Sequence, residues 1–223
     1  MYIGHYAAAF ALKKAAPRVS LGTMFLSVQL LDLLWPLFLL LGVEHVRIDP
    51  GNTPFTPLDF YDYPISHSLV TSLGWALGFG LVYYFRRRDT RGAWILGFGV
   101  FSHWVLDFIT HRPDLPVSPG LNVYVGLGLW YSTAGTILVE GALFIFGVLL
   151  YTRSTPAIDQ TGRYAFWSLI AFFVLTYAVS SFGPPPPNET ALAIGGLSLW
   201  LFVPWGYWIE DHRALGISTR SSG

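Results

Sequence analysis

Residues 92–110 read GAWILGFGVFSHWVLDFIT, an apolar stretch in which His103 and Asp107 are the only ionisable side chains. An α-helix rises about 1.5 Å per residue, so a helix of this length nearly matches the hydrocarbon core of a bilayer, which is about 30 Å thick. An ionisable group at that depth costs about 2.5–3.5 kcal/mol on insertion scales, and it therefore needs a partner or a function. The stretch predicts a transmembrane helix that carries a polar site.

The composition of the whole chain agrees with a membrane location. Of its 223 residues, 53% are hydrophobic and only 12% are charged, whereas a soluble domain carries about 25% charged residues. This composition excludes a disordered chain, a nucleic-acid binder built on a basic surface, and a soluble enzyme. The chain has no cysteine, so any metal must be held by His, Asp or Glu.

Five further stretches have the length and composition of a membrane helix. We therefore expect an all-α, polytopic helix bundle of about six transmembrane helices, forming a single integral membrane domain over residues 1–223. Pro36 and Pro204 fall inside two of the spans and predict kinks. The predicted spans are Ser20–Val43, Ser66–Phe85, Gly92–Thr110, Leu127–Tyr151, Arg163–Phe182 and Thr190–Ile209.

The placement of basic residues predicts the orientation. With the N-terminus in the cytoplasm, Arg47 and Arg112 are the only two of the 13 Lys and Arg residues that fall on the outer side. This is a strong positive-inside bias, so we expect both termini to be cytoplasmic, in a bacterial or archaeal inner membrane. Arg86, Arg87 and Arg88 belong to this topology signal. The outer side is instead acidic, with Glu44, Asp49, Asp59, Asp62 and Asp114, and we interpret the four aspartates as a solvated face.

The N-terminal segment is apolar but too short to span a bilayer. It fits either a helix lying on the inner surface or a short helix inserted among the others. A surface helix needs a polar face, and residues 6–12, YAAAFAL, offer none. We therefore expect this segment, with His5, to be inserted against the other helices.

The polar residues within the spans suggest a metal site. His103, Asp107 and His111 are spaced at i, i+4 and i+8, which places them on one helix face. Imidazole nitrogens and carboxylate oxygens are ligands of hydrolytic zinc sites. Helix-rise arithmetic places Asp32 at a depth similar to that of His103, and His67 near the outer surface. The expected arrangement is a column of polar groups from mid-membrane to the outer face.

Several short motifs resemble those of the membrane-bound metal-dependent hydrolases, also described as LexA-binding, inner-membrane-associated hydrolases. That family has an N-terminal His, an acidic motif after the first long apolar segment, a Thr-His-Ser motif, and a Ser-His followed by Asp and Thr. The resemblance covers residues 1–120, while 121–223 form three further helices without a recognised motif. The matching residues are Gly4-His5, Leu31-Asp32-Leu33, Ser66-His67-Ser68, Ser102-His103, Asp107 and Thr110.

The chain departs from that family at two places. The family often has a second acidic residue followed by His, where this chain has Leu34 and Trp35. It also often has His-Arg-Gly before Thr-His-Ser, where this chain has residues 61–65, YDYPI.

The resemblance implies metal-dependent hydrolysis with one or two divalent ions, for which we expect zinc. The implied ligands are His5, Asp32, His67, His103 and Asp107. We expect His111 as a possible additional ligand and Glu140 as a catalytic base.

Asp32 or Asp107 would bridge two ions or act as the base. A site near the outer leaflet favours a lipid or lipid-linked substrate, whose headgroup Arg47 and Arg112 would receive.

Two other functions stay open. The chain is alternatively a non-catalytic subunit of a larger membrane assembly, with a vestigial or structural metal site. It is also compatible with a transporter or proton relay, because such proteins use columns of Asp, His and Glu. The expected partners are membrane lipid, a second copy or a larger membrane complex, and not nucleic acid.

Overall fold

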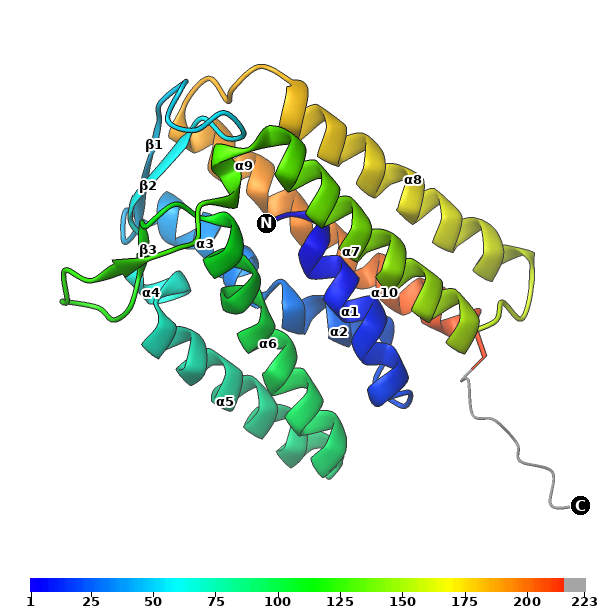
Figure 1. Ribbon diagram of the computed structural model, residues 1–223. Helices are drawn as coiled ribbons and strands as arrows, with labels where there is room; N and C mark the ends of the chain where they lie inside the picture. The colour runs from blue at the N-terminus through cyan, green and yellow to red at the C-terminus, as the bar shows by residue number, and fades with distance from the viewer. Residues whose placement is uncertain (215–223) are drawn as a thin grey trace, which may run out of the picture.

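The long apolar segments fold into helices, and the predicted all-α class is confirmed. The computed structural model describes residues 1–214. Figure 1 shows the two short strand pairs at one end of the bundle and the described C-terminal residues near the other. The elements are α1 (Ile3–Ala15), α2 (Leu21–Val28), α3 (Leu30–Leu40), β1 (His45–Ile48), β2 (Leu58–Asp62), α4 (Pro64–His67), α5 (Leu69–Arg87), α6 (Thr90–Thr110), β3 (Leu115–Pro116), β4 (Tyr124–Val125), η1 (Leu129–Tyr131), α7 (Thr133–Ser154), α8 (Gln160–Phe182), α9 (Glu189–Leu197), η2 (Ser198–Leu201) and α10 (Phe202–Asp211).

Several helices are long and apolar enough to cross a membrane, as an integral membrane protein requires. Four meet this condition: α6, α7, α8 and the stretch Glu189–Asp211, and the bent pair α2–α3 raises the number to five. The remaining predicted span corresponds to α5, which is not among them because glycines, tyrosines and terminal arginines reduce its apolar character. Arg220 and the C-terminus, used in the orientation argument, lie outside the described residues.

The first predicted span breaks at Gln29 and not at Pro36. Helices α2 and α3 meet there at an angle of 56°. Pro36 stays inside α3 and packs closely on Gly196 of α9. A Cβ added to Gly196 would lie 2.7 Å from the ring of Pro36. Pro204 lies in the first turn of α10, where a missing N–H is tolerated. The bend at Gln29 aims the first turn of α3 into the bundle.

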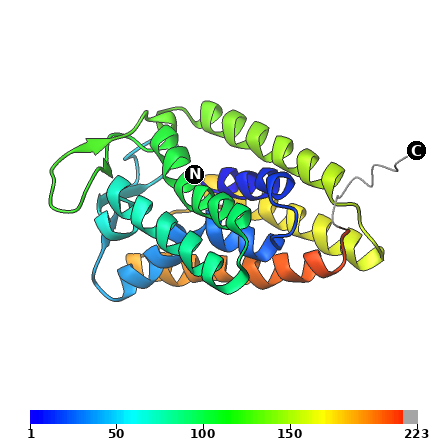
Figure 2. The same cartoon turned by 90° about the horizontal axis from the view of Figure 1, so that it is seen from below.

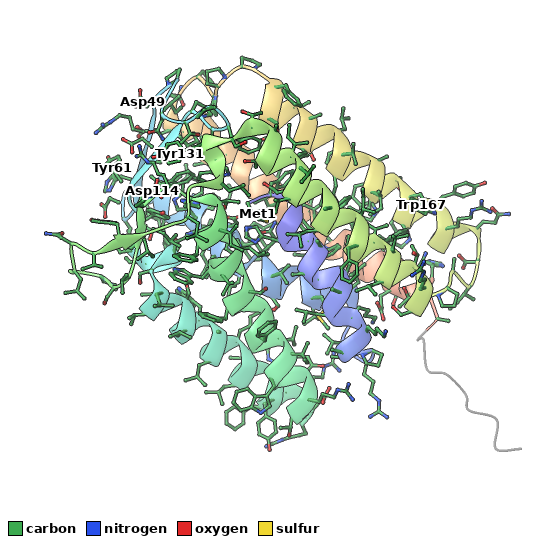
Figure 3. The ribbon with its side chains drawn as sticks, viewed as in Figure 1. Met1, Asp49, Tyr61, Asp114, Tyr131 and Trp167 are labelled. Carbon is green, nitrogen blue, oxygen red and sulfur yellow. The ribbon has the colours of Figure 1, made fainter. Side chains whose placement is uncertain are left out.

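The inserted N-terminal helix is confirmed. His5, Tyr6, Ala9 and Phe10 of α1 are fully buried, and α1 contacts α2, α6, α7 and α8. Figure 2 shows α1 enclosed by the other helices. In contrast, Trp167 of α8 lies on the outer side of the bundle and is half exposed (Figure 3). Helix α1 is therefore a central element that every surrounding helix helps to position.

Helices α1 and α7 touch at a glycine, which gives a first prediction. A Cβ at Gly147 would lie 2.6 Å from the carbonyl oxygen of Ala7. We expect Gly147→Ala to push the helices apart and lower the free energy of unfolding by about 1–3 kcal/mol. Gly141 of α7 is the matched control, because a Cβ there meets nothing within 4 Å. Equal melting temperatures of the two alanine variants in detergent would contradict this packing.

Candidate metal centre

Four segments bring the predicted ligands together. Helix α1 supplies His5, α3 supplies Asp32, and α6 supplies His103 and Asp107 one turn apart. His67 ends the short helix α4, and the extended backbone of Ser68 separates it from α5. Helix-rise arithmetic predicted that His67 lies near the outer surface. This prediction is wrong, because His67 is buried beside Asp32 and Asp107. The five side chains form one cluster in place of the expected column.

Four side-chain atoms, from Asp32, His67, His103 and Asp107, lie at distances close to those of neighbouring metal ligands. His103 Nε2 lies 3.1 Å from Asp107 Oδ2 and 3.6 Å from Asp32 Oδ1. His67 Nε2 lies 3.4 Å from Asp32 Oδ1 and 3.8 Å from Asp107 Oδ2. Ligands at zinc–ligand distances of about 2.0–2.2 Å in a tetrahedral site lie about 3.3–3.6 Å apart. These four distances are close to those of neighbouring ligands in a tetrahedral site, but each compact ligand group among the described residues contains either Asp32 or Asp107 and not both.

His5 contacts the other carboxylate oxygen of Asp107. Its Nε2 lies 3.1 Å from Asp107 Oδ1, and its ring stacks on that of His103 with centroids 3.6 Å apart. The amino group of Met1 lies 2.7 Å from the same Asp107 oxygen, and Figure 3 shows Met1 within the bundle. His5, His103 and Asp107 form one possible ligand group, and Asp32, His67 and His103 form another. Asp107 therefore links His5 to the other three residues.

Buried polar atoms without partners support the binding of a cation. Among the described residues, His5 Nδ1 has no hydrogen-bond partner, and His5 Nε2 and His103 Nε2 have an Asp107 oxygen at 3.1 Å but no hydrogen bond of good geometry. Such atoms nearly always find one, and leaving one unpaired costs about 1–3 kcal/mol. His103 Nδ1 lies 2.7 Å from the carbonyl oxygen of Val28. With the proton on Nδ1, this bond fixes the ring and leaves the Nε2 lone pair for a metal.

Glu44 supports His67, a role that the sequence did not predict. Glu44 was expected only as one of the acidic residues of the outer side, but its side chain is buried. Its carboxylate accepts hydrogen bonds from the backbone N–H groups of Ile65 and Ser66, each at 2.7 Å, and from Ser66 Oγ at 2.6 Å. Ser66 Oγ in turn lies 2.6 Å from His67 Nδ1. The first N–H groups of α4 have no acceptor within the helix, and Glu44 supplies one. In the sequence, the only sign of this role was an acidic residue between two predicted spans.

This support predicts the effect of removing the Glu44 carboxylate. We expect Glu44→Ala to weaken metal binding by about 10–100-fold, because groups that orient metal ligands contribute on this scale. Asp62→Ala is the matched control, since Asp62 is half exposed and pairs with His45 at 2.9 Å. Competition with a chromophoric chelator measures both affinities. Equal metal affinities of the two variants would contradict the role of Glu44 in orienting His67.

A cavity of about 190 Å³ lies beside the cluster. Asp32, Asp107 and Glu140 line it. Further side chains come from the loop before β2 and from β2 itself: Phe55, Thr56, Leu58 and Phe60. Glu140 Oε2 accepts hydrogen bonds from the backbone N–H groups of Tyr2 at 2.8 Å and Gly4 at 3.3 Å. Its Oε1 is buried and has no partner among the described residues. Glu140 thus caps α1 and also presents an uncommitted oxygen.

His111 lies outside both ligand groups. It lines the cavity, but its Nδ1 lies 2.9 Å from Asp114 and 3.2 Å from the hydroxyl of Tyr63. Burial lowers the pKa of His111, although the hydrogen bond to Asp114 opposes this. Asp114 is itself buried, so its interpretation as a solvated carboxylate is wrong.

The two outer arginines do not line the cavity. Arg112 pairs with Asp59 and, at 2.9 Å, with Asp114. Burial alone would lower the pKa of Arg112, but the hydrogen bond and charge of Asp114 raise it. Arg47 is largely exposed, 3.4 Å from Asp59 and stacked over Tyr61. Figure 3 shows Tyr61 and Asp114 toward the strand end of the molecule, away from Met1. These arginines hold together the loops at the strand end of the bundle and do not line the cavity beside the cluster.

No family model, curated protein or solved structure matches this chain.

Proposed function

We propose that this protein is a metal-dependent hydrolase that acts on a lipid or lipid-linked substrate near the outer leaflet. The observation that carries this proposal is the convergence of Asp32, His67, His103 and Asp107 at ligand spacing beside a cavity. The family resemblance of the sequence points to the same residues. Imidazole and carboxylate ligands suit zinc, and His5 would complete the site or help to hold a second ion.

The bound ion would supply Lewis-acid chemistry, polarising the scissile group and making water acidic near neutral pH. The chain would supply the proton acceptor. Glu140 fits this role because Oε1 is unpaired while Oε2 is held by the start of α1. Asp32 is the more exposed of the two ligand carboxylates, with 24% of its side chain accessible against 3% for Asp107. Substrate in the cavity would therefore meet Asp32 before Asp107 and the fully buried Glu140.

The lipid assignment rests on the surroundings of the cavity. Phe55, Phe60 and Trp130 line it together with the polar residues. Its other lining residues include Glu140 of α7 and Tyr177 of α8, two helices apolar enough to span a membrane. A substrate with a polar group to hydrolyse and an apolar remainder suits such walls.

The packing favours hydrolysis over a proton relay. Beyond His5, α1 continues into an apolar cluster in which Phe10, Phe25 and Phe166 are fully buried. The polar side chains buried near them, such as Tyr6, Tyr151 and Gln29, carry no charge at neutral pH. A proton relay across the membrane uses Asp, Glu and His side chains.

Elemental analysis and a substrate panel test the proposal. The protein purified in detergent without added chelator is expected to contain one or two zinc ions per chain. It is then incubated with phosphate-ester and carboxylate-ester lipids, and release of phosphate or fatty acid is measured before and after chelation. Chelator-sensitive release supports the hydrolase. Bound metal without turnover on any of these lipids would favour the subunit with a structural metal site, and absence of metal would contradict both.

A further inference from the structure

A second cavity, of about 390 Å³, forms an apolar groove between α8 and the α9–η2–α10 segment. Phe172, Thr176 and Ser180 line it from one face of α8. Their spacing of four residues gives the groove a length of about 12 Å along the helix. The opposite wall includes Leu201 and Phe202, of which Leu201 is largely exposed. The groove is therefore accessible from the side of the bundle that faces lipid.

The groove adjoins the cavity at the metal centre. Tyr2 and Ser180 line both of them. The hydroxyl of Tyr2 lies 2.9 Å from Thr176 Oγ1 in the groove, while its backbone N–H donates to Glu140 in the cavity. The two spaces thus meet at Tyr2, the residue that precedes α1.

The sizes of the two spaces are complementary. Ligand pockets in proteins measure roughly 300–1,000 Å³, so the cavity of about 190 Å³ holds little more than a small polar group. Joined to the groove of about 390 Å³, it reaches the usual range. The combined space has a polar end with Asp32 and Glu140 and an apolar end with Phe172 and Phe202.

We infer that the groove binds a hydrocarbon chain of the substrate, so that an amphiphilic lipid reaches the metal centre laterally between α8 and α9. This inference rests on the proposed function and names its substrate class. The polar end lies toward the loops and the apolar end lies deeper along α8, which matches the orientation of a lipid in a leaflet. Because bilayer tails are as apolar as the groove, the groove contributes positioning of the headgroup more than binding energy.

Gly195 of α9 provides a direct test. It lines the groove, and a Cβ there would meet nothing within 4 Å. Gly195→Leu should fill the groove from an open position, and Gly195→Ala should fill it in part. Gly141→Leu on α7 is the matched control, because Gly141 is equally open and lies outside the groove. Metal content and melting temperature report whether each variant is folded.

The binding probe is a phosphatidic acid with a diazirine on its palmitoyl chain, mixed into phosphatidylglycerol vesicles that contain the protein. After photolysis, we expect the label to concentrate on residues 172–180 and 195–205 of the wild type. It should fall at least fivefold there in Gly195→Leu, fall less in Gly195→Ala and stay unchanged in Gly141→Leu. Label spread evenly over the lipid-facing helices, or insensitive to Gly195→Leu, would overturn the inference.

A second readout separates this inference from the proposed function. For the hydrolysed ester class, turnover is compared between a long-chain substrate and its short-chain, water-soluble analogue. The ratio of long-chain to short-chain turnover should fall at least tenfold in Gly195→Leu and stay at the wild-type value in Gly141→Leu. An unchanged ratio would contradict binding of the substrate chain in the groove, but it would not contradict the proposed hydrolase function. Absence of all turnover would reject the hydrolase, and the labelling pattern would still decide whether the groove binds a chain.

Discussion

Replacing His103 with alanine should remove the bound metal and abolish hydrolysis together. His103 Nε2 belongs to both possible ligand groups, and its ring is fixed by the carbonyl of Val28. A water molecule that took the place of the imidazole as ligand would not be held by the Val28 carbonyl. We expect metal affinity to fall at least 100-fold, and turnover to fall to background, in elemental analysis and lipid hydrolysis assays.

His45→Ala is the control for this substitution. His45 lies in β1, is partly exposed and pairs with Asp62. It belongs to neither ligand group. It should retain wild-type metal content and activity. Retention of metal by His103→Ala would contradict the ligand assignment, and metal loss without any loss of turnover would contradict metal-dependent hydrolysis.

Replacing Glu140 with glutamine should remove activity and leave the metal. Glu140 is in neither ligand group, and the amide oxygen of glutamine can still accept the N–H groups of Tyr2 and Gly4 that Glu140 binds now. Loss of a general base reduces turnover by about 10²–10⁴-fold. We therefore expect kcat to fall by this factor while the zinc content stays at the wild-type value.

Two further variants sharpen this second prediction. Glu189→Gln, at the exposed first residue of α9, should leave turnover unchanged. Glu140→Ala removes the cap of α1 as well as the base, so it should also lower the melting temperature and loosen His5. Wild-type turnover in Glu140→Gln would show that another group accepts the proton, and Asp32 would then be the next candidate.

The shared face of His103 and Asp107 and the insertion of α1 could be predicted because short-range patterns determine them, whereas Asp32 and His67 were expected as ligands from the family resemblance. The i, i+4 relation of His103 and Asp107 holds on any helix, and the all-apolar surroundings of His5 indicated an inserted helix. The depth of His67 could not be predicted in the same way. It depends on an extended residue, Ser68, that ends α4 before α5 begins. A pattern that treats residues 66–85 as one span hides such a break.

Tertiary contacts explain the other differences. Glu44 follows an apolar span and looks like a surface acid, but it is buried because the N–H groups of Ile65 and Ser66 attract its carboxylate. Arg112 looks like a free outer cation, yet Asp59 and Asp114 bind it. Both outcomes depend on how distant loops fold over the bundle, which local sequence patterns do not encode.

The central claim is that one metal ion is held by residues from α3, α4 and α6. X-ray absorption spectroscopy at the zinc edge of the purified protein tests it most directly. The account predicts only nitrogen and oxygen neighbours at about 2.0–2.2 Å, with the outer-shell scattering of two imidazoles, one of which disappears in His67→Ala. A spectrum that lacks imidazole scattering, or one unchanged by His67→Ala, would contradict the account.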